Sequence, residues 1–470
     1  MARLVGIDVG TTACKALAID AEGRVLGSAS AEYPLHVPQP RWTEQEPEDW
    51  WRAVRSCLDA LGPERPDAIG LTGQMHGAVF LDASGESVRP AILWNDQRTV
   101  AEVAEIDRVC GPERVRRITC NPPVTGFQAP KILWLRRNEP ERFARVRSVL
   151  LPKDFIRLRL TGDAATDVSD ASGTGLFDVG RRAWADELIA DLDLDRSLFP
   201  RAAESYEITG HAADGVPVVA GGGDQAASAV GTGAVERGVL SVSLGTSGVV
   251  FSALEGPEFD KGGSAHTFCH ANGKWHAMGV TLACGGSLKW FRDVLGGGES
   301  YDALMAQAAA VPPGARGLTF LPYLSGERCP HNDPDASGAF AGLTLAHGRA
   351  ELARSVVEGA TFGLRDALDL LAGLGASAGT VRVTGGGARS RFWVQLLADV
   401  FDARCATLEG DEGPAMGAAM LAGVGVGVWP DVAAASRACV REQWETGPSG
   451  ADYSGALRAF RELYPKLRPG

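Results

Sequence analysis

The chain has 470 residues, of which 46 are Lys or Arg and 58 are Asp or Glu, giving a net charge of −12. An acidic chain is not expected to bind nucleic acid, because contact with phosphate backbones requires a basic surface. Hydrophobic residues make up 45% of the chain, which argues against general disorder. At roughly 150 residues per domain, the length predicts two or three domains.

Neither a membrane segment nor a secretion signal is expected from the sequence. No apolar run is long enough to span a bilayer, and the acidic Asp8 interrupts the start of the chain. The nine cysteines are odd in number, scattered and free of any CxxC pair. This pattern indicates reduced thiols and a cytoplasmic location.

The first part of the chain predicts three antiparallel strands, a helix and a fourth strand. The run from Thr43 to Glu46 resembles a capping box, and Pro47 follows it as a residue of the first helical turn. Gly62 and Pro63 are expected to end the helix. The predicted strands cover residues 3–8, 13–19, 24–33 and 68–72.

The start of this unit recurs near the middle of the chain. The first strand leads into Gly10-Thr11-Thr12, and a strand over residues 239–244 leads into Gly245-Thr246-Ser247. In this alignment Asp8 corresponds to Ser243, so only the first copy has a carboxylate. We therefore expect two similar halves, each with a phosphate-binding turn.

The duplication divides the chain into an N-terminal domain over residues 1–235 and a C-terminal domain over residues 236–470. Each half is expected to contribute one of the two phosphate-binding turns. The tail from about residue 430 is less patterned. Further strands are expected at residues 216–220 and 380–384, and helices near residues 283–295, 350–373, 391–400 and 414–424.

The Gly10-Thr11-Thr12 turn is a candidate phosphate site. Backbone N–H groups of a tight turn can point at phosphate oxygens, and the threonine hydroxyls add donors. Asp8 can hold Mg²⁺, since hard cations prefer carboxylate oxygens, and Lys15 can reach a terminal phosphate. The alternative is an ordinary hairpin turn.

Asp224 is a candidate general base. It follows an apolar strand and three glycines, Gly221 to Gly223, and ligands in open α/β sheets bind beyond the carboxyl ends of strands. A carboxylate there can accept a proton from an attacking hydroxyl. The alternative is that Asp224 only caps the following helix.

Two more glycine-bounded segments suggest ligand contacts. Gln74, Met75 and His76 lie between Gly73 and Gly77, which suits a ligand with several hydroxyl groups, although a lone histidine is more often structural. Later, Gly385-Gly386-Gly387 precedes a helix, where it can contact adenine or phosphate.

A group of metal-ligand residue types is interpreted as structural. His266, Cys269, His270 and His276 surround the hairpin-turn sequence Asn272-Gly273. In a hairpin His266 and His270 point away from Cys269, so tetrahedral zinc ligation would need distortion.

Taken together, these motifs resemble those of the FGGY carbohydrate kinases. Residues 129–134 and 338–358 also fit that family, and the resemblance runs in order through residues 3–425. It implies an α/β fold of two ribonuclease H-like domains, the actin-like ATPase fold, with a ligand cleft between them. It further implies ATP and Mg²⁺, with a small-molecule sugar as acceptor.

Within the family, four stretches are similar to members that phosphorylate D-xylulose at O5: residues 73–77, 89–96, 151–154 and 322–328. By this resemblance Asp224 is the base and Asp8 the residue that holds the metal. The implied substrate-binding residues are Gln74, Met75, His76, Trp94, Asp224 and Gln225. The implied ATP-binding residues are Thr11, Thr12, Lys15, Gly245, Thr246, Gly285, Lys289, Gly386, Gly387 and Ser390.

Two alternatives stay open. Gln225 stands where the D-xylulose kinases often have Asn, so the acceptor can be another ketose or a polyol. Outside the class, the actin-like fold also supports ATPases without sugar transfer, which lack a polar pocket such as Gln74 to His76. No nucleic acid or membrane partner is expected, and a homodimer is one option for the assembly.

Overall fold

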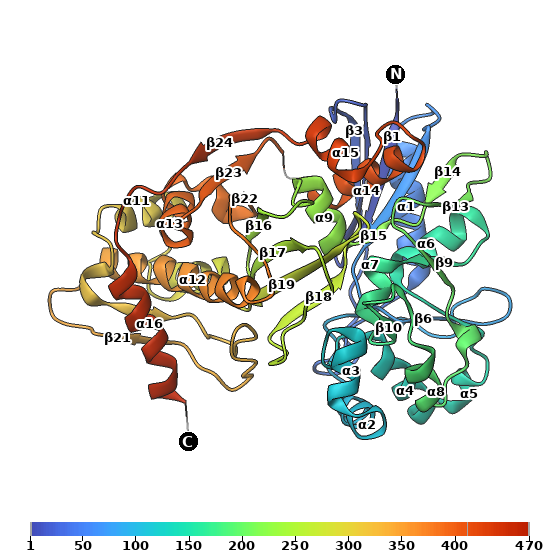
Figure 1. Ribbon diagram of the computed structural model, residues 1–470, viewed down its shortest axis with the longest axis horizontal. Coiled ribbons are helices and arrows are strands. Elements are labelled where there is room, and N and C mark those ends of the chain that lie inside the picture. The colour runs from blue at the N-terminus through green and yellow to red at the C-terminus, as the bar shows by residue number, and fades with distance from the viewer. Residues whose placement is uncertain (1, 411, 469–470) are drawn as a thin grey trace.

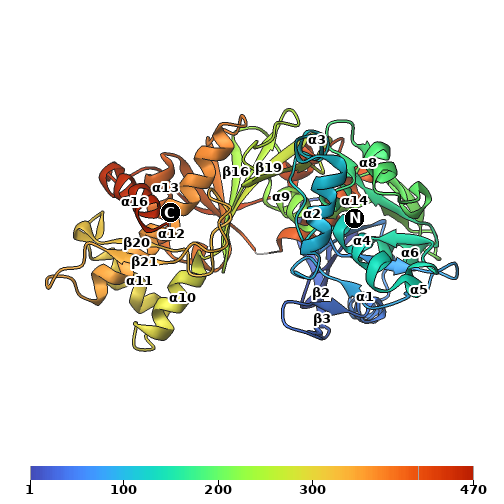
Figure 2. The same ribbon diagram turned by 90° about the horizontal axis from the view of Figure 1, so that it is seen from below.

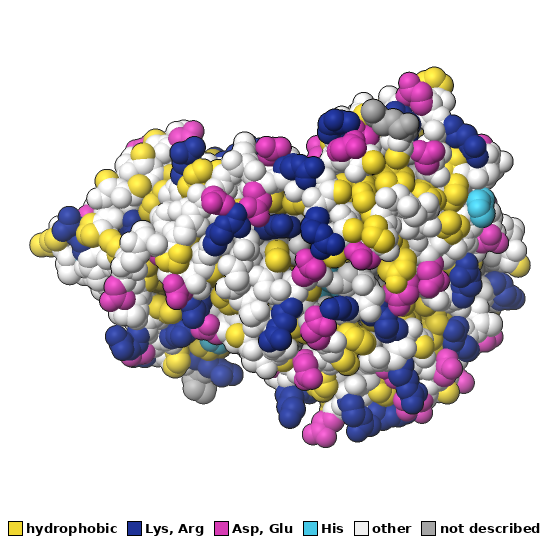
Figure 3. Space-filling view, turned by 45° about the horizontal axis from the view of Figure 1, so that its top comes forward, with side chains coloured by type: hydrophobic (Ala, Val, Ile, Leu, Met, Phe, Trp, Pro, Cys, Tyr) yellow, Lys and Arg dark blue, Asp and Glu magenta, His cyan; other side chains and the backbone are white. Residues whose placement is uncertain are grey.

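The computed structural model describes residues 2–410 and 412–468 and shows two lobes, each built around a seven-stranded sheet. The first half of the chain forms one lobe and most of the second half forms the other (Figures 1 and 2). Acidic and basic side chains are interspersed on the face seen in Figure 3. No helix in the described ranges is both long and apolar enough to cross a membrane.

The first sheet has the order β13-β14-β5-β1-β2-β3, with β15 paired to β5. Its central strand β1 runs antiparallel to β2 and parallel to β5. β1 and β5 are rich in small and branched apolar residues and are almost fully buried. The strands are β1 (Leu4–Val9), β2 (Ala13–Ile19), β3 (Val25–Glu32), β5 (Ala68–Gly73), β13 (Ile208–His211), β14 (Pro217–Val219) and β15 (Gly222–Gly223).

The second sheet, in the order β18-β19-β17-β16-β22-β23-β24, repeats this core. Its strand β16 runs antiparallel to β17 and parallel to β22. Asp8 lies opposite Thr72 of β5, and Ser243 lies opposite Thr384 of β22. The strands are β16 (Val239–Leu244), β17 (Gly248–Leu254), β18 (Ala265–Cys269), β19 (Trp275–Thr281), β22 (Thr380–Thr384), β23 (Arg404–Leu408) and β24 (Glu442–Thr446).

The predicted α/β class and the duplication are therefore confirmed. The first sheet carries α1 and α6 on one side, whereas α14 packs against β1, β2 and β5. In the second lobe α12 packs on β17 and β19, and α13 packs on β23. These helices are α1 (Pro47–Ala60), α6 (Pro152–Thr161), α9 (Asp224–Thr232), α10 (Gly285–Val294), α12 (Arg349–Ala372), α13 (Arg391–Phe401), α14 (Gly413–Gly425), α15 (Val432–Cys439) and α16 (Ser454–Leu467).

The remaining elements lie mostly in an insertion between β5 and β13. It holds a second apolar cluster of its own, built around Ile132, Phe177 and Leu188. The helices here are α2 (Val100–Cys110), α3 (Pro112–Thr119), α4 (Gln128–Asn138), α5 (Pro140–Phe143), α7 (Val168–Ala171), α8 (Asp186–Asp191) and, in the other lobe, α11 (Tyr301–Ala309). Short strands include β4 (Glu44–Gln45), β7 (Ala91–Ile92), β9 (Ala165–Asp167), β12 (Arg201–Ala203), β20 (Thr319–Leu321) and β21 (Ala339–Ala341).

The helices α9 and α14 cross between the lobes at backbone contact (Figure 1). A Cβ atom added to Gly417 would lie 1.8 Å from the Ala227 carbonyl oxygen. One added to Gly231 would lie 2.1 Å from the Gly413 carbonyl oxygen. Only glycine at both positions permits this approach, so the crossing depends on these two residues.

One local prediction was wrong, and one segment is more regular than its sequence pattern indicated. Thr43 does not cap α1: its N–H donates to the Asp96 carboxylate at 2.7 Å, while Glu44 and Gln45 form β4. Glu46 is the N-cap, without a side-chain cap hydrogen bond, although Pro47 does begin the helix. The tail after residue 430 is also regular, since α15, β24 and α16 pack on the two lobes.

Gly417→Ala should destabilise the protein strongly, because the methyl group has no space at the crossing. Overpacking of this kind costs about 1–3 kcal/mol of unfolding free energy or more. Gly455→Ala is the matched control, since Gly455 also lies in a helix and no atom lies within 4 Å of its added Cβ. Thermal unfolding of both variants checks this, and equal melting temperatures would contradict it.

Candidate active site

The turn between β1 and β2 contacts residues from three separate segments. The Thr11 hydroxyl donates to Gln74 Oε1 at 3.3 Å and accepts from Trp94 Nε1 at 3.0 Å. Gln45 Nε2 donates to the Thr11 carbonyl at 2.7 Å, and Gln45 Oε1 accepts from Gln74 Nε2 at 2.9 Å. The predicted residues Thr11, Gln74 and Trp94 therefore lie together. Gln45, fully buried, is a member of this group that the sequence did not reveal.

Asp8 lies at the end of β1 and faces the same side of the sheet as Lys15, its cross-strand partner. Burial raises the pKa of Asp8 to about 7, the Asp224 carboxylate adds to the rise, and Lys15 opposes it. Among the described residues, Asp8 Oδ1 is buried without a hydrogen-bond partner. Lys15 forms an ion pair with Glu412, just before α14.

The Asp224 carboxylate stands at the first residue of α9, directly after the glycine strand β15. Burial raises its pKa to about 6, although Gln225 opposes the rise by donating Nε2 to Oδ1 at 3.3 Å. A Cβ on Gly223 would lie 2.9 Å from the Met75 side chain. The predicted residues Met75, Asp224 and Gln225 are thus neighbours, and two weakly acidic carboxyl groups, Asp8 and Asp224, share one site.

The His76 side chain is held in one tautomer. Its backbone is left-handed, with φ 66°, a conformation that is unfavourable for a non-glycine residue. Nδ1 lies 2.7 Å from the Gly173 carbonyl oxygen, which can only accept, so Nδ1 carries the proton. Burial lowers the pKa of His76 to about 3. The ring is neutral, and Nε2 remains as a hydrogen-bond acceptor.

Lys131 and Arg328 act on His76, although the sequence analysis assigned neither of them to the site. Lys131 Nζ donates to the His76 carbonyl at 2.8 Å. The positive charge of Arg328, from the second lobe, contributes to the lowered pKa of His76 and of His266. Arg328 follows the buried Glu327, whose Oε1 accepts the Leu282 N–H at 2.9 Å. Nothing local in the sequence marks either contact, because both partners are distant in the chain.

In the second lobe, the turn after β16 contacts the start of α10. The Gly285 N–H donates to the Gly245 carbonyl at 2.7 Å, and the Gly286 N–H donates to the Thr246 carbonyl at 3.0 Å. Gly385, with φ 80°, packs against Leu244 and Gly245. The loop with Gly386 and Gly387 follows. The structure therefore brings the predicted residues Gly245, Thr246, Gly285, Gly386 and Gly387 to the end of one sheet.

The other two predicted nucleotide residues make local contacts. Ser390 caps α13 by accepting the Trp393 N–H at 3.3 Å. Lys289 is exposed and pairs with Asp293 at 2.7 Å, one turn later in α10. A cavity of about 850 Å³ lies between the lobes and is lined by Ser243 and by Gly385, the first residue of the glycine segment. Gly386, Gly387 and the other residues predicted to bind ATP do not line it.

The four His and Cys residues of the β18–β19 hairpin are buried among aromatic rings. His276 stacks on Phe251, and His266 stacks on Phe268. In the part of the chain that the structure describes, no cluster of three or more His, Cys, Asp or Glu side chains is arranged to hold a metal ion. The structural interpretation of these residues stays a prediction.

Comparisons with known proteins match almost the whole chain. The family model for FGGY carbohydrate kinases, N-terminal domain, matches residues 3–231, and the model for the C-terminal domain matches residues 240–426. A xylulose kinase of Escherichia coli (strain K12) is 42% identical over 485 residues, covering 99% of each chain.

Solved structures agree over the same length. The crystal structure of a xyloylose kinase from Brucella ovis has a TM-score of 0.94, with 38% identity and 99% of each chain covered. A gluconate kinase from Lactobacillus acidophilus has a TM-score of 0.92, with 27% identity and 99% of each chain covered.

Proposed function

We propose that this chain, which belongs to the FGGY family of carbohydrate kinases, transfers the γ-phosphoryl group of ATP to O5 of D-xylulose. Both halves match the family, so the enzyme is a sugar kinase with ATP as its phosphoryl donor. The choice of D-xylulose rests chiefly on the 42% identity, over 99% of the chain, to the xylulose kinase of Escherichia coli.

In the proposed reaction Asp224 accepts the O5 proton while the oxygen attacks the γ-phosphorus. The base must be ionised, and a pKa of about 6 leaves it so at neutral pH. Its place at the start of α9, beside Met75 and near Asp8, supports the role. Phosphoryl transfer depends mainly on positioning and on neutralising charge.

We assign sugar binding to the first lobe. His76 Nε2 can accept a hydrogen bond from a sugar hydroxyl, because Nδ1 is committed to Gly173. Met75 packs on the glycine before Asp224, and Gln225 donates to the Asp224 carboxylate. Gln74 and Trp94 both hydrogen-bond to Thr11. Such a pocket provides both an acceptor and apolar surface for a polyhydroxylated ligand.

The two Gly-Thr turns are proposed to bind the phosphates of ATP from opposite lobes through their N–H and hydroxyl groups. Lys15 would leave Glu412 to meet the terminal phosphate. Asp8 fits a cation, since one of its buried oxygens has no partner among the residues described. Mg²⁺ held there would offset negative charge on the phosphates. Lys289, Gly386 and Ser390 are proposed to contact the adenosine.

A related acceptor is the second candidate. The gluconate kinase from Lactobacillus acidophilus has nearly the same fold at 27% identity, so the fold alone does not select the sugar. Gln225, beside the proposed base, is where we expect that selection to act. The cytoplasmic location and a homodimer also stay predictions.

An ADP-release assay over a panel of sugars tests the proposed substrate. At equal concentration, D-xylulose should give the highest kcat/KM among pentuloses, hexuloses, polyols and gluconate, and the product should carry phosphate on O5 by NMR. A higher kcat/KM for another acceptor would replace D-xylulose. ADP release that is independent of any sugar would contradict the whole proposal.

Asp224→Asn should lower kcat by about 10²–10⁴-fold, the usual range for loss of a general base, while ATP still binds. In the wild type the carboxylate becomes protonated as pH falls, so kcat/KM for the sugar should drop tenfold per pH unit below about pH 6. The Asn variant should lose this acidic limb. A variant within threefold of wild type would rule out Asp224 as the base.

His76→Ala should raise KM for the sugar at least tenfold and leave KM for ATP within about twofold, because the lost acceptor contacts only the sugar. Loss of one hydrogen bond to a bound hydroxyl costs about 0.5–1.5 kcal/mol, and more where its partner stays buried. Steady-state kinetics with each substrate varied in turn measures the split. Equal changes in both KM values would remove His76 from the sugar site.

A further inference from the structure

The segment directly before Asp224 has no side chains to fix its position. It consists of Gly221, Gly222 and Gly223, and its strand β15 pairs with Thr72 and Gly73 of β5. Two further hydrogen bonds hold this strand from the other side. The Gly221 N–H donates to the Ser205 carbonyl at 2.9 Å, and the Gly223 N–H donates to Ser169 Oγ at 3.1 Å.

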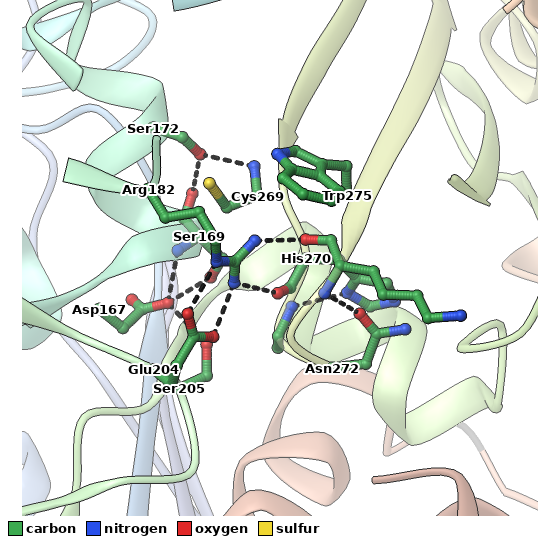
Figure 4. Close-up of polar contacts among 12 residues, drawn as sticks. Asp167, Ser169, Ser172, Arg182, Glu204, Ser205, Cys269, His270, Asn272 and Trp275 are labelled. Carbon is green, nitrogen blue, oxygen red and sulfur yellow. Dashed lines mark hydrogen bonds and ion pairs between the residues drawn. The ribbon is translucent and has the colours of Figure 1, made fainter. Parts of the chain in front are cut away.

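Both supporting residues converge on Asp167 (Figure 4). Its Oδ2 accepts the Ser169 hydroxyl at 2.5 Å and the Ser205 hydroxyl at 2.8 Å. Asp167 and the two serines are fully buried. Lys153, also buried, places Nζ 2.9 Å from Asp167 Oδ1 and 2.5 Å from Asp154 Oδ1.

The Gly223 N–H sets the direction of the hydrogen bonds at Ser169. An N–H can only donate, so Ser169 Oγ accepts from Gly223 and gives its own hydroxyl proton to Asp167 Oδ2. Hydrogen bonds to an ionised partner are shorter and roughly twice as strong as neutral ones. Lys153, Asp167 and Ser169 therefore form a chain of directed contacts that ends one residue before Asp224.

The residues that follow Ser169 in the chain also contact His76 and the second lobe. The Gly173 carbonyl fixes His76 Nδ1 at 2.7 Å. The Ser172 hydroxyl accepts the Cys269 N–H from the β18–β19 hairpin at 3.2 Å. Arg182 binds Glu204 at 2.6 Å and also donates to the His270 carbonyl at 3.3 Å (Figure 4). The chain around Ser169 is thus fixed by contacts to His76 in the first lobe and to the β18–β19 hairpin in the second.

From this geometry we infer that Ser169 is a positioning residue for Asp224, acting through the Gly223 N–H with Asp167 as its anchor. The inference rests on the proposed function, because it takes Asp224 as the base. A general base must stay within hydrogen-bond reach of the proton it removes. A misplacement of about 1 Å can cost 10²-fold in rate. The glycine segment has no side chains that could interlock with its neighbours, so its backbone hydrogen bonds are important for its position.

Ser169→Ala and Ser205→Ala form a matched pair that tests this role. Each removes one buried hydroxyl from the same oxygen of Asp167, so both should lower the melting temperature by similar amounts. Only Ser169→Ala leaves the Gly223 N–H without its acceptor, since Ser205 holds Gly221 through its main chain. Ser169→Ala should lower kcat at least tenfold with KM for ATP within twofold, and Ser205→Ala should lower kcat less than threefold. Equal kcat values would overturn the inference.

A double variant separates this inference from the proposed function. If Ser169 acts through Asp224, Ser169→Ala should add less than a twofold loss in the Asp224→Asn background, measured by single turnover. A full tenfold loss there would show a merely structural role and overturn the inference. If Asp224→Asn itself keeps wild-type activity, the assignment of the base fails instead, whatever the serine variants do.

Discussion

The crossing of α9 and α14 at Gly231 and Gly417 determines how the two halves of the site meet. The first residue of α9 is Asp224, and α14 packs on β1, whose end carries Asp8. Because protein interiors are close-packed and hardly compressible, the distance between the two helices at this crossing also fixes the positions of the segments attached to them. The separation between the proposed base and the proposed phosphate-binding turns therefore depends on the close approach at these two glycines.

The two lobes repeat a backbone pattern but not a charge pattern. Asp8 and Ser243 hold equivalent positions in their sheets. In the first lobe, Asp224 lies close enough to Asp8 to raise its pKa. A further carboxylate in the same space would add to this repulsion between negative charges. With a neutral serine in the second lobe, no third carboxyl group faces the place where we propose that the anionic phosphates bind.

Local sequence patterns predicted the sheet cores and the positions of the two Gly-Thr turns well. The strand Ala13–Ile19 and the strand Thr380–Thr384 have the predicted bounds, because alternating apolar residues and glycine turns determine them locally. Asp224 was recognisable since it follows three glycines at a strand end. The expected capping box at Thr43 failed because Asp96, far along the chain, takes its N–H.

The support residues could not be found in this way. Gln45 reaches Thr11 and Gln74, and Ser169 reaches Gly223, across separations of 29 to 54 residues. Each is a common polar residue in a segment without periodicity. Their roles depend on tertiary contacts, and no local sequence pattern indicates them. The glycine run at residues 221–223, by contrast, can be seen directly in the sequence.

The packing of α14 on the first sheet also has a consequence for the order of folding. Leu4, Leu17 and Ile19 are buried against Met420 and Leu421 of α14. During synthesis at 5–20 residues per second, α14 follows β5 by roughly 340 residues, or about 20–70 s. Until then one apolar face of the first sheet stays uncovered, so the first lobe cannot mature on its own while the ribosome is still making the second.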